Sequence, residues 1–262
     1  MPESTPQGYS LSKLYTGNGA QRYHELSLHD NSEIPSILEL LSQIHDPTLA
    51  GMRVLELASG SGRVTLPIAA AGHRVLATDL SEDMLSILRQ RISDRAARRA
   101  GLDERIEVRQ ADMTAFTTDE RFKAVCIPTV SITLLAPSQQ RHTLERATAC
   151  LAPGGTFLVS TEHIVAREPM THSIQLRRDV EFVETINPTA GTWRTILRWG
   201  DETYTTDLYL TPPSWLTAEL NKLGLTVFFQ HSVPHPGLPG RSNVLLGAVA
   251  PSHPLSAREM RP

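Results

Sequence analysis

The sequence predicts an α/β protein built on a doubly wound, mostly parallel sheet. Short apolar segments typical of strands alternate with helical segments between residues 52 and 161. Glycine or proline stands where several of these segments end, as at Gly72 and Pro153. A glycine-rich turn, residues 58–62, directly follows the first strand. Such alternation is typical of βαβ units, whose right-handed crossovers place helices on both faces of one sheet.

Length and composition exclude several classes of protein. The 262 residues suit one α/β domain or two small ones. A 40% hydrophobic content and a net charge of -3 argue against disorder, and 25 basic against 28 acidic residues argue against a nucleic-acid partner. No apolar run approaches the roughly 20 residues of a membrane span, and the first ten residues lack a secretory pattern. We therefore expect a cytoplasmic protein with no membrane partner, no metal site and two buried reduced thiols, Cys126 and Cys150.

The first two regions follow from local patterns. Residues 1–48 are expected to form a helical lid, because Ile34, Ile37, Leu38 and Leu41 recur at helical spacing. Residues 49–162 are expected to form the core of the fold. Its five strands are predicted at 52–57, 74–78, 106–109, 122–127 and 156–161, and its helices at 63–71, 81–100 and 138–151.

Beyond residue 162 the pattern changes to alternating apolar and polar residues. This alternation at 180–186, 192–199 and 203–210 predicts an antiparallel β insertion spanning residues 163–212. Residues 213–250 return to the core with one helix and a final strand pair. The proline-rich end, residues 251–262, reads as a flexible tail.

Acidic residues stand at or just after the ends of three strands of the predicted sheet. Glu56 precedes the glycine-rich turn, Asp79 closes the second strand 19 residues after Gly60 (79 − 60), and Asp112 closes the third. Open α/β sheets bind ligands at the carboxyl edge, where these turns meet. A carboxylate at the end of the second strand can accept hydrogen bonds from both ribose hydroxyls of a nucleoside.

Two nucleoside ligands suit such an edge: a dinucleotide and S-adenosylmethionine (SAM). A dinucleotide site is expected to carry a G-x-G-x-x-G turn, whereas this chain has A-x-G-x-G, preceded by Glu56. A carboxylate there repels a pyrophosphate but attracts an ammonium group. SAM has an ammonium group and no phosphate, so the charge pattern favours it.

Four segments in order resemble the motifs of class I SAM-dependent methyltransferases: 54–62, 77–84, 110–113 and 151–155. The resemblance implies a Rossmann-like sheet of seven strands, with one antiparallel strand near the edge. The final strand pair agrees with this. The resemblance also implies a set of cofactor contacts at Tyr23, Glu56, Ala58, Gly60, Gly62, Asp79, Leu80, Met84, Asp112, Met113, Ile127, Pro128 and Thr129.

One of these positions departs from the family pattern. Ala58 stands where glycine is usual, and we expect the backbone there to have a negative φ, which alanine accepts readily.

The acceptor side is less defined, because methyl transfer from a sulfonium needs mainly alignment. Tyr15 in the lid and His163 after the fifth strand are the catalytic candidates, His163 as a base. The insertion carries Trp193 and Trp199 and is expected to choose the acceptor or to form a homodimer contact.

We expect methyl transfer from SAM to a nitrogen or oxygen atom of a small molecule or short peptide, as in natural-product tailoring, with S-adenosylhomocysteine (SAH) as product. The alternatives are a non-catalytic SAM-binding protein and an NAD(P)-dependent oxidoreductase.

Overall fold

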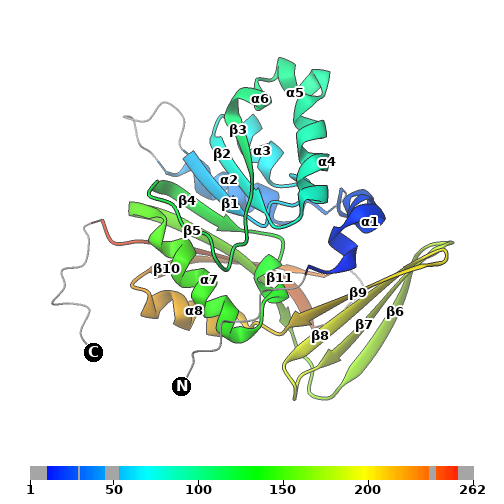
Figure 1. The fold of residues 1–262 in the computed structure, drawn as a ribbon. Helices are drawn as coiled ribbons and strands as arrows, with labels where there is room; N and C mark the ends of the chain where they lie inside the picture. Colours follow the sequence, from blue (N-terminus) through cyan, green and yellow to red (C-terminus); the bar gives the residue numbers. More distant parts are fainter. Residues whose placement is uncertain (1–10, 29, 45–52, 236–239, 253–262) are drawn as a thin grey trace, which may run out of the picture.

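The computed structural model describes residues 11–28, 30–44, 53–235 and 240–252 (Figure 1). Within them, one mixed sheet has the strand order β10-β11-β5-β4-β1-β2-β3. Its strands are β1 (Arg53–Leu57), β2 (Arg74–Asp79), β3 (Ile106–Gln110), β4 (Phe122–Ile127), β5 (Leu151–Ile164), β10 (Thr226–Pro234) and β11 (Arg241–Val249). β11 pairs antiparallel with both β5 and β10, and the pairs from β5 to β3 are parallel. The predicted fold class, including the single antiparallel strand near the edge, is confirmed.

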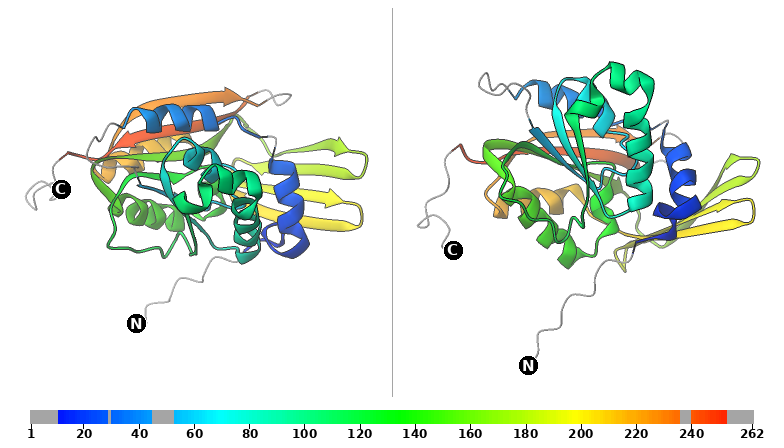
Figure 2. Two further views of the ribbon diagram at one scale, coloured as in Figure 1. Left: turned by 90° about the horizontal axis from the view of Figure 1, so that it is seen from above. Right: turned by 45° about the horizontal axis from the view of Figure 1, so that its top comes forward.

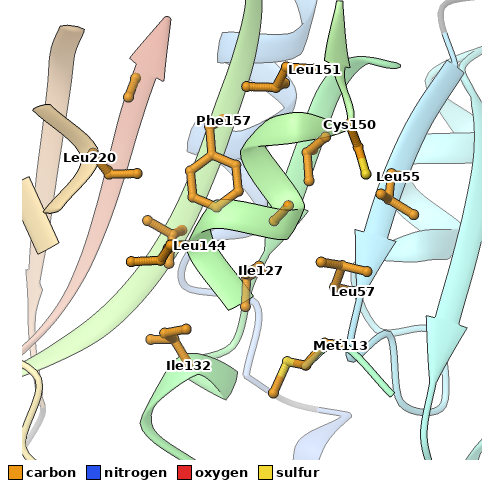
Figure 3. Close-up of a cluster of buried hydrophobic side chains, with 14 of the residues drawn as sticks. Leu55, Leu57, Met113, Ile127, Ile132, Leu144, Cys150, Leu151, Phe157 and Leu220 are labelled. Atoms are coloured by element: carbon orange, nitrogen blue, oxygen red, sulfur yellow. The ribbon is translucent and has the colours of Figure 1, made fainter. Parts of the chain in front are cut away.

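Helices cover both faces of this sheet, because successive strand residues point to opposite sides. α2 (Ile34–Ser42), α3 (Thr65–Ala70) and α4 (Glu82–Ser93) pack on one face, where Val54 is fully buried. α7 (Pro137–Ala149) and α8 (Pro213–Lys222) pack on the other, against Leu55 and Phe157. Figure 3 shows this second layer, with Leu144 of α7 and Leu220 of α8 beside Phe157.

The helix predicted at 81–100 is shorter than expected. Ser81 caps α4 as predicted, since its side chain accepts from the Met84 amide, but α4 ends at Ser93. Asp94 is extended, and two short helices follow, α5 (Arg95–Arg99) and α6 (Leu102–Arg105). Within the described ranges, none of the helices is both long and apolar enough to cross a membrane.

The N-terminal segment consists of a short 3-10 helix, η1 (Lys13–Tyr15), and α1 (Gly17–Ser27). The Ser81 hydroxyl donates to the Tyr15 carbonyl, and an Asp83 oxygen accepts from the Gly17 amide at 2.7 Å. On its other side, the Ser12 hydroxyl donates to the Thr205 carbonyl at 2.9 Å. The segment therefore lies between the large sheet and the insertion (Figure 2).

The insertion is a separate antiparallel sheet of four strands. β6 (Met170–Arg177), β7 (Val180–Asn187), β8 (Thr192–Trp199) and β9 (Glu202–Tyr209) pair in chain order. The sequence predicted the last three strands, and β6 is an addition. β6 is an exposed edge strand, so its apolar alternation is weak. The end of the chain predicted as a tail lies outside the described residues from 253 onward.

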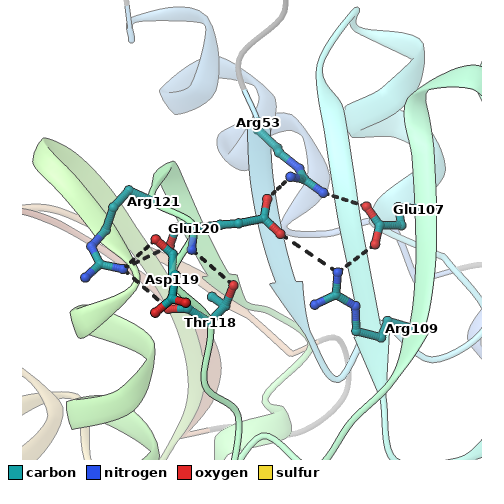
Figure 4. Close-up of polar contacts among 7 residues, drawn as sticks. All are labelled: Arg53, Glu107, Arg109, Thr118, Asp119, Glu120 and Arg121. Carbon is teal, nitrogen blue, oxygen red and sulfur yellow. Dashed lines mark hydrogen bonds and ion pairs between the residues drawn. The ribbon is translucent and has the colours of Figure 1, made fainter.

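At the amino-terminal ends of the parallel strands, an ion-pair network links β1, β3 and the segment before β4 (Figure 4). Arg53, the first residue of β1, pairs with Glu120 before β4 and, at 2.5 Å, with Glu107 of β3. Arg109 pairs with Glu107 at 2.7 Å. These side chains are substantially exposed, so the network adds little stability. It lies at the opposite end of the strands from the cavity described next.

Candidate active site

The carboxyl ends of β1 and β2, with the segments that follow β3 and β4, open into one cavity of about 430 Å³. The N-terminal segment forms a second wall, and one face of the four-stranded sheet forms a third. Residues from these three walls include Tyr15, Tyr23, Glu56, Ala58, Gly60, Asp79, Asp112, Thr129, Glu184, Trp193, Thr195, Thr206 and Arg241. The insertion therefore shares its cavity with the predicted cofactor motifs.

The turn after β1 is built from left-handed residues. Gly60 has a φ of 56° and Ala58 a φ of 57°, so the expected negative φ at Ala58 is wrong. A side chain of one methyl group tolerates this conformation at a cost of roughly 1–2 kcal/mol. Gly62, with a φ of 82°, is absent from the cavity wall. A Cβ atom there would lie 2.3 Å from Leu88 Cδ1, so this glycine lets α4 pack closely.

Gly60→Ala is expected to weaken the binding of SAM at least tenfold, because a methyl group would stand where the turn borders the cavity. Gly200→Ala is the matched control. Both glycines have a φ of 56°, but a Cβ atom at Gly200 meets no atom within 4 Å. Each variant loses roughly 1–2 kcal/mol of stability to the left-handed backbone. Equal affinities by calorimetry in the two variants would refute a close approach at Gly60.

Asp79 fixes this turn from the end of β2. Its Oδ2 accepts from the Gly60 amide at 2.8 Å, and its Oδ1 accepts from the Ser81 amide at 2.8 Å. Burial raises the pKa of this carboxyl. Leu80 and Met84 line the cavity beside it. Two backbone amides thus orient the Asp79 carboxylate, which also lines the cavity. A carboxylate that binds a diol needs both properties.

Glu56 is buried at the base of the same cavity. Its Oε2 accepts from the Thr65 hydroxyl at 2.7 Å. Burial raises the pKa of Glu56 to about 8, and the neighbouring carboxyls of Glu33 and Asp79 act in the same direction. A cation bound beside Glu56 would favour its charged form. This site therefore suits a ligand that brings a positive charge.

The third acidic turn also reaches the cavity. Asp112 and Met113 line it, and Asp112 Oδ1 accepts from both the amide and the hydroxyl of Thr114, each at 2.8 Å. Across the cavity, Tyr15 and Tyr23 form an edge-to-face pair with ring centroids 5.1 Å apart. Burial raises the pKa of Tyr23. The predicted residues of the lid and of the third strand therefore lie around one space.

The segment after β4 contains an unusual backbone. Thr129 and Val130 have φ values of 58° and 51°, which β-branched residues rarely adopt. A carboxylate oxygen of Glu33 accepts from the Thr129 amide at 2.7 Å, and the Ser160 hydroxyl accepts from the Val130 amide at 2.9 Å. Both strained residues line the cavity, and strain of this kind is concentrated at functional sites.

Two predicted contacts before this turn have a different role. Ile127 is fully buried in the core, and Pro128 is also buried. Neither lines the cavity, because the side chains at the end of β4 pack inside the sheet. Only Thr129 of the three residues predicted here reaches the cavity wall.

The structure does not bring His163 to the cavity. Strand alternation in β5 buries Glu162 and leaves His163 exposed, and His163 is absent from the cavity wall. Its predicted role as a base has no support from this position. The sequence predicted His163 just past the fifth strand, but β5 continues to Ile164 and contains it.

His163→Ala is accordingly expected to change kcat less than about twofold, far below the ~10²–10⁴-fold effect of a positioned acid or base. Steady-state release of SAH at several pH values is the measurement. A large loss of kcat together with a lost pH limb would restore His163 as the base.

Several residues that line the cavity were not predicted from the sequence. Ser59 lies inside the recognised turn, and its buried Oγ has no hydrogen-bond partner among the described residues. Arg63 follows the turn and pairs with Asp30 at 2.7 Å. Glu184 and Arg241 come from the insertion and β11. The unpaired Ser59 hydroxyl, the Asp79 carboxylate and the Glu56 carboxyl fit a polar nucleoside ligand with a cationic group.

Comparison with known proteins agrees with this geometry. A family model described as a methyltransferase domain matches residues 54–155. A demethylmenaquinone methyltransferase of Clavibacter sepedonicus is 35% identical over 112 residues. That match spans 42% of this chain and 41% of the relative, so the two share less than half of their lengths.

Solved structures extend the likeness across most of the fold. The glycopeptide N-methyltransferase MtfA complexed with SAM is 28% identical, with a TM-score of 0.58 over 85% of this chain and 96% of that chain. The CcbJ methyltransferase of Streptomyces caelestis is 21% identical, with a TM-score of 0.68 over 83% of this chain and 90% of that chain. Together with the four motifs and the sheet order, these findings place the domain at residues 54–155 in the class I SAM-dependent methyltransferase family.

Proposed function

We propose that the protein transfers a methyl group from SAM to a nitrogen or oxygen atom of a small molecule or short peptide, and releases SAH. The observation that carries this proposal is the pair of carboxyls around one glycine turn. Asp79 is oriented to accept from a diol, and Glu56 is placed to favour a cation. The solved relatives include proteins described with SAM and SAH bound, which supports the choice of ligand.

In this proposal, different residues of the cavity wall bind different parts of SAM. Asp79 holds the ribose hydroxyls, and Glu56 favours the ammonium end. Leu80, Met84 and Met113 give an apolar contact for a flat base. When bound, SAM supplies an electrophilic methyl group on its sulfur. The chain then has to hold the acceptor in line with that methyl group and exclude water.

The lid and the insertion supply that enclosure. Tyr15 and Tyr23 cover the cavity from the N-terminal segment, and Phe182, Trp193 and Leu197 cover it from the small sheet. Of the two predicted catalytic residues, Tyr15 lines the cavity and His163 does not, so Tyr15 remains the catalytic candidate. Because the inner face of the insertion lines the cavity, the insertion is better suited to acceptor binding than to a dimer contact.

A two-stage experiment tests the proposal. Calorimetry with SAM, SAH and NAD tests the cofactor, and we expect binding of the first two and none of NAD, since the turn lacks the G-x-G-x-x-G pattern of a dinucleotide site. SAH release with a library of amines, alcohols and short peptides then tests catalysis. Tight binding of NAD would favour an oxidoreductase, and SAM binding with no turnover across the library would favour a non-catalytic protein.

A further inference from the structure

A polar row crosses the inner face of the four-stranded sheet. Glu184 of β7 pairs in register with Thr195 of β8, which pairs in register with Thr206 of β9. All three side chains are buried and line the cavity. Cross-strand neighbours of this kind lie about 5 Å apart at their Cβ atoms. The row is therefore a continuous polar stripe rather than three separate positions.

Apolar rows flank this stripe on both sides. Phe182 pairs with Leu197, two residues toward one end of the strands, and Ile186 pairs with Trp193 toward the other. These flanking side chains belong to two small hydrophobic clusters. A ligand on this face would thus meet an apolar surface interrupted by one polar line.

The stripe carries an excess of negative charge. Glu184 accepts from Trp193 Nε1 at 3.1 Å and from an Arg241 guanidinium nitrogen. The same guanidinium pairs through two nitrogens with Glu162, one of them at 2.9 Å. Two carboxylates therefore share one arginine, and all three groups are at least nine-tenths buried. One negative charge of this network is left without a partner among the described residues.

The other charged groups of the cavity do not compensate for it. Apart from Glu56, whose carboxyl is mainly protonated at pH 7, its wall contains the carboxylates of Asp30, Asp79, Asp112 and Glu184 against the guanidinium groups of Arg63 and Arg241. Arg63 pairs with Asp30, and Arg241 is shared as described. His235 also lines the cavity. A wall with such an excess of carboxylates disfavours an anionic ligand and favours a cation.

Thr195 provides a second, independent observation. Its side chain is 7% exposed, lies at the middle of the stripe and lines the cavity. Within the described ranges its hydroxyl has no hydrogen-bond partner, whereas the Thr206 hydroxyl lies 2.9 Å from the Ser12 hydroxyl. Because Thr195 lines the cavity, its hydroxyl is available to form a hydrogen bond with a ligand held on this wall.

We propose that the methyl acceptor is an amine on an apolar scaffold, held as its ammonium form by Glu184 and Thr195. This inference rests on the proposed methyl transfer. Hydrogen bonds from an ammonium to a carboxylate are stronger than those from a neutral hydroxyl, and a carboxylate acceptor would be repelled. Before reaction the ammonium gives one proton to solvent. Its nitrogen lone pair then forms the N–C bond as the C–S bond breaks, which leaves a methylated ammonium and neutral SAH.

Matched probes on the SAH-saturated protein test this choice of acceptor. Tryptamine, tryptophol and indole-3-propionate share one scaffold and differ in an amine, an alcohol and a carboxylate; phenethylamine, phenethyl alcohol and 3-phenylpropionate form a second set. Calorimetry is expected to show the amine binding about tenfold more tightly than its alcohol, with the carboxylate weakest, since the contrast is between charge-assisted and neutral hydrogen bonds. Alcohols that bind as tightly as the amines, or no binding by either amine, would overturn the proposal.

Two variants test whether Glu184 and Thr195 are responsible for the preference for amines. Glu184→Gln is expected to reduce the amine-to-alcohol affinity ratio to about one, because it removes the excess charge and keeps an acceptor for Trp193. Glu181→Gln is its control, since Glu181 lies on the opposite face of β7 and pairs with Arg198 at the surface. Thr195→Val should weaken amine binding and leave SAH affinity unchanged. An unchanged ratio in Glu184→Gln would overturn the role of the stripe, whereas failure of wild type to bind SAH would instead overturn the proposed function.

Discussion

Asp79→Ala is expected to bind SAM ~30- to 150-fold more weakly than wild type, a loss of about 2–3 kcal/mol, as for hydrogen bonds made to a charged group. Two contributions act together. The variant loses the acceptor proposed for the ribose hydroxyls. It also leaves the Gly60 amide without the oxygen that lies 2.8 Å away in the folded chain, so the turn loses its anchor.

Binding of adenosine, which has the ribose but not the methionine part of SAM, separates the effect at Asp79 from effects at the methionine end. Asp79→Ala should weaken the binding of adenosine and of SAM by similar factors, because both carry the ribose. Asp103→Ala removes an exposed carboxylate from α6 and serves as the control. Titration calorimetry with both ligands is the measurement. Dissociation constants in Asp79→Ala that match those of Asp103→Ala would rule out the ribose assignment.

The position of the predicted cofactor residues at one cavity could be inferred from the sequence, because its determinants are local. Glu56, Gly60 and Asp79 are each placed by the end of one parallel strand, and parallel strands end at a common edge. A strand read from a short apolar segment therefore predicts where the next side chains lie. The same logic placed Asp112 and Met113 correctly at the cavity.

The wall that we propose for the acceptor depends on contacts that sequence patterns do not contain. Arg241 meets Glu162 across 79 residues of chain through the pairing of β11 with β5, and it meets Glu184 of the separate four-stranded sheet across 57 residues. His163 was predicted to follow the fifth strand, but it lies within β5, because that strand continues to Ile164, beyond its predicted end.

Backbone strain was also beyond prediction. The left-handed Thr129 and Val130 are held by two tertiary hydrogen bonds, which their backbone amides donate to Glu33 in the lid region and to Ser160 in β5. The weak alternation of β6 likewise gave no strand signal, since that strand is held by pairing with β7 rather than by burial. Local patterns thus predicted the strand ends that frame the cavity, whereas long-range pairing determines the wall that we propose for the acceptor.

Glu56→Gln is expected to stabilise the fold at alkaline pH while weakening the binding of SAM. Burial raises the pKa of Glu56 to about 8, against 4.5 for the free side chain. A carboxyl whose folded pKa is raised favours the folded state fully below pH 4.5, and that contribution is lost as the pH rises through 8. At about 1.4 kcal/mol per pKa unit, the loss is of the order of 5 kcal/mol by pH 9.

Glutamine cannot ionise, and it keeps an oxygen for the Thr65 hydroxyl. The difference in unfolding free energy between Glu56→Gln and wild type should therefore grow in favour of the variant by several kcal/mol between pH 5 and pH 9, as measured by urea titration. Glu39→Gln, an exposed site on α2, should show no such growth. A difference that stays constant with pH would mean that Glu56 titrates normally.

The same ionisation predicts a signature of ligand binding. If a cationic ligand favours the charged form of Glu56, then wild type should release a proton on binding SAM at pH 7. The measured enthalpy would then depend on the ionisation enthalpy of the buffer, and this dependence should vanish in Glu56→Gln. Adenosine, which lacks the ammonium group, should bind wild type without releasing a proton from Glu56. Equal proton release with both ligands would show that Glu56 does not face the cationic end, and that the buried carboxyl is a structural feature of the turn.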